Sequence, residues 1–452
     1  MSQNRVPFGT REVRAGPRFT DEHEARYFIY YCDGISKKIG GPFNSKLWAQ
    51  LVPQAGEGTP FIGRAVIALG ALSLSLSTSQ ERERHHRYAL NQYVLALQGM
   101  RRSIKDHPYD VRTALIGCLL IFIFESLQGH QAAACSHASS GTNLITSMCR
   151  SRCAPKAWRE SEIGEELYSA FSGLNLQSLL FEGGCTDDGF YKHGLSEAAK
   201  GMPESFDDLD ECRRFWHYFM RRNLHFCREV ASFYSRARSL DDADIQEVEK
   251  ELKEERDGYV QQICRWEIAS APLLCRLFTS GEEGEAFLVA CLLRIHAAMS
   301  IVLLSRAFNP PEMEYDRFCE QFRTTVELSE RIHGLLVSGE NEESGTFRFE
   351  IGILPALSLV TLLCRERALR GRAVKLLGRS KGYKEGIWNA DAVRAVGEWV
   401  RGVEEDGLED AENVSNEKRM SVLGCETRVE ERRAKVRFRH ADGVERDALV
   451  EW

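Results

Sequence analysis

Apolar residues recur at intervals of three and four along most of the chain, a pattern that predicts α-helices. The first predicted helix begins near Thr20, which we expect to be its N-cap. Residues 61–76 and Ala114–Phe124 are apolar on nearly every side, as is typical of helices surrounded by other helices. Pro355 predicts a kink or a helix start. Further helices are predicted over about 131–150, 160–181, 207–238, 243–270, 285–306, 312–337, 351–363, 368–377 and 390–403.

The last part of the chain has a different period, in which apolar and charged residues alternate. The apolar members of the first alternating run are Ala434, Val436 and Phe438. A second run follows after Ala441–Gly443, and two such runs joined by Asp-Gly predict a β-hairpin. A three-residue loop places Arg439 opposite Glu445. It also places Arg437 opposite Asp447, so that each pair carries opposite charges.

These patterns together predict an all-α protein, with a large bundle-like domain of many helices and a small C-terminal β-hairpin. Only 12 prolines in 452 residues leave room for long helices. We expect a flexible leader over residues 1–19 and a helical domain over 20–403. An acidic linker over 404–426 and the hairpin over 427–452 complete the predicted organisation.

The composition matches a folded, water-soluble protein, with 43% hydrophobic and 28% charged residues. The 59 basic and 66 acidic residues give a formal net charge of −7, which does not attract nucleic acid or acidic lipid. Residues 114–124 are far fewer than the ~20 that a bilayer requires. Residues 286–304 carry Arg294 and His296 at their centre. We therefore predict buried helices and no membrane segment.

The 14 cysteines are scattered along the chain, unlike the close framework of a disulfide-rich secreted domain. The N-terminus shows no secretory pattern, so we expect a reducing, intracellular compartment. Five thiols stand in apolar helical stretches, where we expect them to be small buried hydrophobic groups. These are Cys118, Cys264, Cys275, Cys291 and Cys364.

One close set of thiol and imidazole groups could bind zinc: Cys135, His137, Cys149 and Cys153. On a helix, Cys135 and His137 point about 200° apart and cannot share one metal ion. Only Cys149 and Cys153 have the spacing of a zinc-binding pair. We therefore predict no metal site and no cofactor.

The acidic run 207–211 resembles the magnesium-diphosphate motif of helical terpene synthases, in which Asp207, Asp208 and Glu211 would be the ligands. The second motif that such an enzyme needs on a facing helix does not occur in the sequence. Carboxylates also stabilise the positive end of a helix, so we interpret the run as a helix start. A terpene-synthase-like enzyme remains the alternative.

Other enzyme signatures are missing from the sequence, including the nucleophile elbow and the glycine-rich phosphate loops. His23 and Glu24 lack the second histidine of a zinc-protease motif, since Tyr27 stands in its place. His85 and His86 lie in a charged run, where we expect them to be solvated. We therefore predict no catalytic residues.

A basic run lies between positions 365 and 384. Its members are Arg365, Arg367, Arg370, Arg372, Lys375, Arg379, Lys381 and Lys384. Such a run could be a nuclear-import or phosphate-binding patch. Because Leu369, Ala373 and Leu377 interrupt it at helical spacing, we favour a solvated helix face.

The order of several packing segments points to a family. The segments are Phe61–Leu72, Leu115–Phe122, Phe124–Gly129, Ile353–Leu357, Cys364–Arg367, Arg372–Leu377, Gly386–Trp388 and Glu398–Val400. In this order they resemble the regulatory region of fungal zinc-cluster (Zn₂Cys₆) transcription factors, over nearly the whole chain from Thr20. The resemblance implies an all-helical domain that governs activity, partner contact or dimerisation.

The chain departs from that family at one important point. Family members usually carry an N-terminal cluster of six cysteines that opens Cys-x₂-Cys-x₆-Cys, binds two zinc ions and docks on DNA. Here no Cys-x₂-Cys occurs, and the first cysteine is Cys32. We therefore expect a nuclear transcription regulator without its own DNA-binding domain.

We expect this regulator to act through protein partners, the transcription machinery or a DNA-bound factor. The family resemblance further implies control of a secondary-metabolite gene cluster. An inactive or truncated interaction scaffold is a second alternative. The sequence leaves open whether the chain forms a homodimer and whether it has a small-molecule effector.

Overall fold

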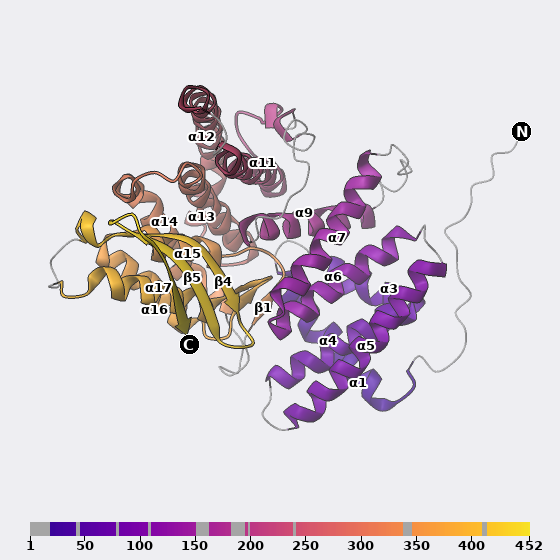
Figure 1. Cartoon of the computed structure of the whole chain (residues 1–452). Helices are drawn as coiled ribbons and strands as arrows, with labels where there is room; N and C mark the ends of the chain where they lie inside the picture. Colours follow the sequence, from indigo (N-terminus) through magenta and orange to yellow (C-terminus); the bar gives the residue numbers. More distant parts are fainter. Residues whose placement is uncertain are drawn as a thin grey trace, which may run out of the picture. The chain divides into compact units, whose positions relative to one another are not determined.

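The chain folds into helices and two small sheets, arranged in two compact units (Figure 1). This computed structural model describes residues 19–41, 46–77, 81–106, 110–150, 162–181, 195–197, 199–237, 241–337, 346–408 and 414–452. The first unit comprises the chain up to Glu125 and Ser136–Phe171. The second comprises Ser126–Cys135 and Ser172–Trp452. The predicted fold class is confirmed. Of the predicted leader, only Phe19 is among the described residues.

The first unit is helical. Its elements are α1 (Glu22–Tyr30), the π-helical η1 (Tyr31–Ile35), α2 (Ser36–Gly40), the π-helical η2 (Leu47–Leu51), α3 (Val52–Gly58), α4 (Pro60–Ser77), α5 (Arg82–Asp106), and parts of α6 (Val111–Gln128), α7 (Gln131–Arg150) and α9 (Glu162–Phe181). Helix α4 packs against α1, α3 and α5. Its side chains Ile62, Val66 and Leu69 are fully buried, as expected for a helix that is apolar on all sides.

Helix α1 begins one residue later than predicted, because Asp21 and not Thr20 is its N-cap. The Oδ1 atom of Asp21 accepts a hydrogen bond of 2.8 Å from the backbone N–H of Glu24. In return, Glu24 Oε2 accepts a 2.8 Å hydrogen bond from the backbone N–H of Thr20. This reciprocal arrangement satisfies two N–H groups at the helix start.

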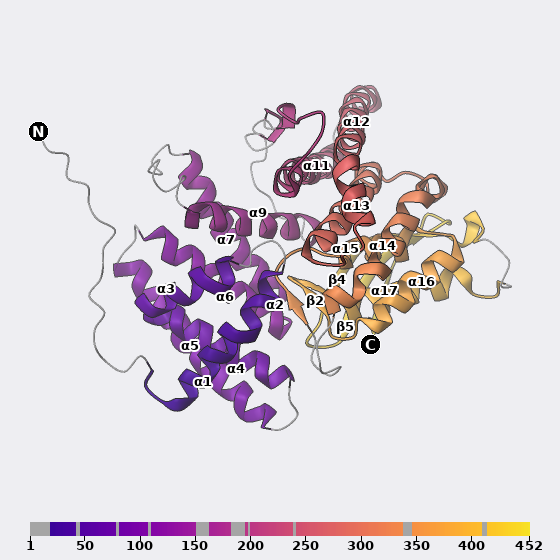
Figure 2. The same cartoon turned by 180° about the vertical axis from the view of Figure 1, so that it is seen from behind.

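The second unit contains long helices and both sheets; Figure 2 shows α13, α14 and α15 side by side. Its elements are α11 (Leu209–Arg236), α12 (Asp242–Thr279), α13 (Glu285–Arg306), the 3₁₀ helix η4 (Glu312–Phe318), α14 (Cys319–Val337), β1 (Phe347–Arg348), α15 (Leu354–Leu363), α16 (Arg367–Arg379), β2 (Lys384–Glu385), β3 (Trp388–Asn389), α17 (Ala390–Glu405), the 3₁₀ helix η5 (Asn416–Lys418), β4 (Met420–Arg428), β5 (Arg433–His440) and β6 (Glu445–Glu451). Most of the predicted helices are found within a few residues of their expected bounds.

Helix α12 is longer than predicted. It continues through Pro272 to Thr279, although proline removes one helical hydrogen bond. Leu273 and Leu274, which follow the proline, are both buried. The packing of this apolar turn therefore outweighs the local cost of Pro272.

The start of α15 is held by a carboxylate from strand β2. The side chain of Glu385 is fully buried. Its oxygens accept hydrogen bonds of 2.8–3.0 Å from the backbone N–H groups of Gly352, Ile353 and Leu354. These groups have no partner within a helix, so the carboxylate satisfies them. The helix start predicted from Pro355 is confirmed.

The C-terminal sheet has the strand order β4-β5-β6 and is antiparallel throughout. The predicted hairpin register is confirmed, since Arg439 pairs with Glu445 and Arg437 with Asp447. The carboxylate of Asp447 forms its ion pair with Lys435 instead, at 2.8 Å. Strand β4 adds a third member and begins inside residues 404–426, where the sequence predicts a linker.

The sheet packs its apolar face against helix α17. The core of this layer consists of Ala395, Val396, Val400, Met420, Val422, Ala434, Val436, Phe438 and Val450. At its edge, the rings of Trp399 and Phe438 meet at a centroid distance of 5.1 Å. The alternation predicted for β5 therefore corresponds to one buried and one exposed face.

Two sequence-based expectations about apolar helices have different outcomes. Cys118, Cys291 and Cys364 are buried, but Cys264 and Cys275 are exposed, because they face outward from α12. Helices α6 and α13 are long and apolar enough to cross a membrane by length and composition alone. However, 67% and 83% of their apolar windows are buried within the protein.

Gly70 of α4 allows α1 and α4 to approach closely. A Cβ atom at this position would lie 2.1 Å from the carbonyl oxygen of Tyr27. By contrast, a Cβ atom at Gly258 of α12 would meet no atom within 4 Å. The two glycines therefore form a matched pair for testing the packing.

We expect Gly70→Ala to lower the free energy of unfolding by about 1–3 kcal/mol, because the added methyl group displaces backbone of α1. Gly258→Ala is expected to raise it by up to about 1 kcal/mol, since alanine favours a helix over glycine. Urea unfolding followed by circular dichroism measures both. Effects of the same sign would contradict this account of the packing.

Candidate functional site

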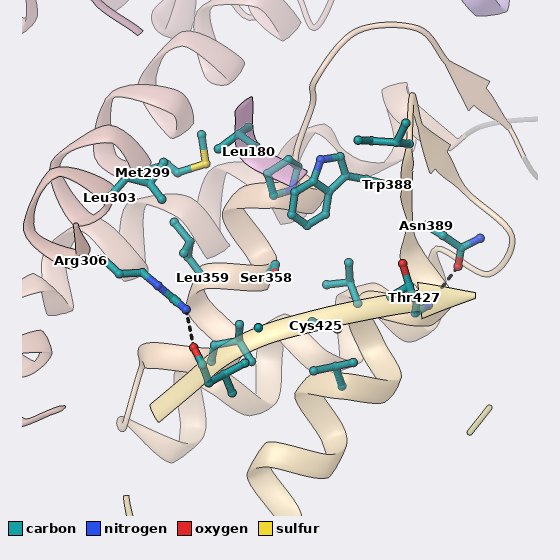
Figure 3. Close-up of a pocket in the computed structure, with 18 of the residues that line it drawn as sticks. Leu180, Met299, Leu303, Arg306, Ser358, Leu359, Trp388, Asn389, Cys425 and Thr427 are labelled. Carbon is teal, nitrogen blue, oxygen red and sulfur yellow. Dashed lines mark hydrogen bonds between the residues drawn. The ribbon is translucent and has the colours of Figure 1, made fainter. Parts of the chain in front are cut away.

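The second unit encloses a pocket of about 300 Å³ between its helices and its C-terminal sheet (Figure 3). Helices α13, α15 and α17, the segment around β3, and strand β4 form the walls. The walls are mainly apolar and include Leu180, Met299, Leu303, Leu359 and Trp388. Pockets of this size and character are suited to small organic molecules.

Arg306 stands at one end of the pocket in Figure 3 and is the one charged side chain among its lining residues. It is the last residue of α13, where a cation also interacts favourably with the helix dipole. Its Nη2 atom donates a hydrogen bond of 2.9 Å to the carbonyl oxygen of Val422. The guanidinium thus connects α13 to strand β4.

The opposite end of the pocket carries uncharged polar groups whose hydrogen bonds are formed within the chain. Thr427 Oγ1 donates a hydrogen bond of 2.6 Å to Gln131 Oε1. Gln131 Nε2 donates one of 2.8 Å to the carbonyl oxygen of Ile387. Asn389 Oδ1 caps α17 by accepting from the backbone N–H of Ala392 at 3.0 Å. Charge is therefore confined to the Arg306 end.

Strand β4 lines the pocket with neighbouring residues because it contains a bulge. The register with β5 shifts between Val422 and Gly424, so that Leu423 has no partner of its own. In a regular strand, adjacent side chains point to opposite faces. A bulge re-aims them, and here Val422, Leu423 and Cys425 all line the pocket.

Buried charged groups hold the start of β4 against α16 and α17. Glu404 of α17 is fully buried. Its Oε2 atom accepts a hydrogen bond of 2.7 Å from Arg370 Nη1. Its Oε1 atom accepts from Arg365 Nη2 at 2.8 Å and from the backbone N–H of Met420 at 2.9 Å. One carboxylate therefore contacts two arginines and the first residue of the strand.

A second carboxylate extends this buried group. Glu312 of η4 accepts a 2.9 Å hydrogen bond from Arg365 Nη2 and a 2.7 Å bond from Ser421 Oγ. Burial raises the pKa of the Glu312 carboxyl, against the lowering effect of Arg365. Arg419 forms a bidentate pair with Asp316 at 2.9 and 3.0 Å. Three consecutive residues, 419–421, are thus fixed by polar contacts, and they lead directly into the pocket wall.

Comparison with known proteins identifies the family. Residues 26–314, well over half of the chain, match the model of the fungal specific transcription factor domain. The chain belongs to this family. The family predicted from the packing segments is therefore confirmed, although the segments after residue 314 lie beyond the matched range.

The sequence is also similar to the aspercryptin biosynthesis cluster-specific transcription regulator atnN of Emericella nidulans. The two chains are 21% identical over 414 residues, covering 73% of this chain and 65% of the relative. This chain thus spans about 65% of the relative's length. No solved structure matches.

In this member of the fungal transcription factor domain family, the acidic run starts a helix, as predicted. Asp208 is the N-cap of α11, and its Oδ2 atom accepts a hydrogen bond of 2.9 Å from the backbone N–H of Glu211. Asp207 is exposed at the same turn. Among the residues that the structure describes, no group of three or more His, Cys, Asp or Glu side chains could hold a metal ion.

The zinc candidates are placed only in part. Cys135 and His137 both lie on α7; Cys135 is buried and His137 half-buried. The side chain of Cys149 and all of Cys153 lie outside the described residues.

His85 is not solvated, contrary to the sequence-based expectation. It is buried, and its Nδ1 atom is 2.7 Å from the hydroxyl oxygen of Tyr27. Burial lowers the pKa of His85. The neighbouring His86 is half-buried. Helical spacing explains the difference, since one face of the charged segment packs against α1.

The basic run is only partly a solvated face. Lys375, Arg379 and Lys381 are exposed, as expected. Arg365 and Arg370 are buried against Glu404, so the prediction is wrong for them. Arg367 pairs with Glu405 at 3.1 Å, and Arg372 forms an exposed pair with Glu330 at 2.7 Å. Lys384 donates a 2.7 Å hydrogen bond to the carbonyl of Leu127, and burial lowers its pKa to about 8.

The acidic partner of the two buried arginines was missed by the sequence analysis, yet a signal for it exists. Glu404 follows Val400 by four residues and Val396 by eight, so it lies on the buried face of α17. Arg370 precedes the buried Val374 by four residues on α16. A charged residue at an apolar position of a helix indicates a buried partner of opposite charge.

A further group of enclosed titratable side chains lies between α11, α13 and the segment before α15. Burial lowers the pKa of His217 to about 3 and that of His296 to about 4. His296 Nε2 donates a hydrogen bond of 2.9 Å to the carbonyl oxygen of Gly352. Burial raises the pKa of Glu350 to about 7, while Arg213 acts in the opposite direction. Both histidines are therefore neutral at physiological pH.

We expect Glu404→Gln to lower the free energy of unfolding by about 3–5 kcal/mol, because Arg365 and Arg370 lose their shared buried charge. Arg372→Gln on α16, the helix of Arg370, is the control, since its exposed pair contributes about 1 kcal/mol or less. Urea unfolding measures the stability, and hydrogen exchange shows whether β4–β6 open first. Equal costs for the two substitutions would contradict the role of Glu404.

The raised pKa of Glu350 predicts a pH dependence. Between pH 4.5 and about 7, the folded chain retains a proton at Glu350 that the unfolded chain releases. The free energy of unfolding of the unsubstituted protein therefore falls as the pH rises through this range, because the folded chain holds the extra proton. Relative to the unsubstituted protein, Glu350→Gln is expected to be more stabilising at pH 8 than at pH 5, by about 1–2 kcal/mol.

Urea unfolding at the two pH values measures this difference, with Glu320→Gln as an exposed control. A gain that is the same at both pH values would mean that Glu350 ionises as an ordinary carboxyl group.

Proposed function

We propose that this chain is the regulatory part of a fungal transcription regulator and that it acts in the nucleus through protein partners. The match of residues 26–314 to the fungal specific transcription factor domain carries this proposal. The described part of the chain is mainly helical, which agrees with the all-helical regulatory domain that the family resemblance implies.

DNA recognition is not proposed for these residues. The sequence contains no Cys-x₂-Cys spacing with which the zinc cluster of related factors begins, and its formal net charge is −7. We propose that a DNA-bound protein brings this chain to its target genes. The transcription machinery is the second expected partner.

The named relative suggests the kind of target. atnN is described as a cluster-specific transcription regulator of aspercryptin biosynthesis. We propose that this chain likewise controls a set of neighbouring biosynthetic genes. The two chains are 21% identical, which supports a biosynthetic gene cluster as the kind of target. It does not support aspercryptin as the product of that cluster.

A regulator fits the start of α11 better than the terpene-synthase alternative does. Such an enzyme needs carboxylate oxygens directed together towards a metal ion. Here the Asp208 carboxylate accepts a backbone hydrogen bond at the helix start. We therefore propose that the protein is not an enzyme.

Deleting the gene is expected to change the transcripts of one co-located set of biosynthetic genes, and a reintroduced copy is expected to restore them. RNA sequencing measures the transcripts, and a fluorescent tag reports whether the protein is nuclear. A reintroduced Arg372→Gln copy should restore the transcripts, whereas Glu404→Gln, which weakens the fold, should not. Unchanged transcripts together with exclusion from the nucleus would favour the interaction scaffold instead.

A further inference from the structure

The pocket behind strand β4 has the size and walls of a small-molecule site. Protein interiors are close-packed and contain few spaces larger than a water molecule. A volume of about 300 Å³ is roughly that of ten water molecules in the liquid. Most of the lining side chains are aliphatic or aromatic. An occupant with an apolar body therefore fits these walls best.

The charged end of the pocket defines the polar group of the occupant. Arg306 carries five N–H groups, and its hydrogen bond to Val422 uses only one of those on Nη2. Glu312 is close enough to feel the charge of Arg306, but its carboxylate is bonded to Arg365 and Ser421. Ser358 on α15 lies beside Leu359 in the middle of the pocket (Figure 3). This end can therefore bind one anionic group.

The opposite end accepts no second charge. Its polar groups, those of Thr427, Gln131 and Asn389, are uncharged and bonded within the chain. Because the pocket has a single guanidinium, a dianionic phosphate would be only half neutralised. A carboxylate has one charge and two oxygens that match the planar guanidinium fork.

We propose that this pocket binds a small, largely apolar monocarboxylic acid, with its carboxylate at Arg306 and its apolar body between Leu359 and Trp388. In Figure 3, Leu359 and Trp388 lie between the Arg306 end and the Asn389 end, as such an orientation requires. The proposal does not depend on the function of the protein in transcription.

A cysteine in the wall provides a direct readout of binding. Cys425 of β4 is exposed and lines the pocket. Cys264 and Cys275 of α12 are exposed as well but do not line it. A ligand in the pocket should slow alkylation of Cys425 by iodoacetamide and leave the other two thiols unchanged. Peptide mass spectrometry of the full chain follows all three thiols in one sample.

The probes are decanoate, decanol and decylamine, which share one chain length and differ in the charge of the polar group. Decanoate is expected to protect Cys425. Decanol should bind at least about tenfold more weakly, because it lacks the charge-assisted hydrogen bonds to Arg306. Decylamine should give no protection.

Two substitutions separate the pocket from non-specific adsorption. Arg306→Gln keeps a donor for the carbonyl oxygen of Val422 but removes the charge, so decanoate should bind about tenfold more weakly and no better than decanol. Leu359→Trp fills the middle of the pocket and should abolish protection by either probe. Leu449→Trp on β6, where the side chain is 59% exposed, is the matched control for added bulk. Circular dichroism establishes that each variant is folded.

Three results would overturn the proposal. The first is equal protection of Cys425 by decanoate and decanol. The second is equal protection of Cys264 and Cys425, which would indicate adsorption to the surface. The third is protection by decanoate that survives both Arg306→Gln and Leu359→Trp in folded protein. Should a variant fail to fold, the comparison of the three probes on the unsubstituted chain decides the proposal alone.

Discussion

The carboxylate of Glu404 is the contact on which the C-terminal half of the second unit depends. It is buried, it neutralises two buried arginines, and it accepts the backbone N–H of the first residue of β4. If α17 separated from α16 or from β4, buried charged groups would lose their partners. The free-energy cost of such a loss is far larger than that of breaking an exposed ion pair. Helices α16 and α17 and strand β4 therefore form one cooperative layer, and the position of the pocket wall follows from it.

Local periodicity allowed most helices and the β5–β6 register to be predicted, because both depend on neighbours within a few residues. Features that depend on distant partners were not predicted. Arg370 and Glu404 are 34 residues apart, and composition alone made the basic run look solvated. Strand β4 escaped detection because its bulge at Leu423 breaks the alternation on which a strand prediction relies. Cys264 was predicted to be buried because its neighbours in the sequence are apolar. Those neighbours do not show which face of α12 points outward, and the thiol is exposed.

The family match and the pocket overlap only partly. The matched range ends at residue 314, after α13 and its terminal Arg306. The other walls of the pocket, α15, α17 and β4, come later in the chain. Membership of the family therefore describes the helical framework on which the cavity is built, whereas most side chains that would distinguish one occupant from another lie beyond it.

The bulge in β4 is a place where the strand can lose a residue without turning the pocket wall over. Residues directly opposite each other in an antiparallel pair point to the same face. Val422 lies opposite Phe438 and Gly424 opposite Arg437, so without the unpaired Leu423 the same pairs would follow one another in regular alternation. Deletion of that codon would therefore remove one lining side chain and leave the others on their face, whereas deletion of a paired residue of β4 would shift the register and invert one side of the strand.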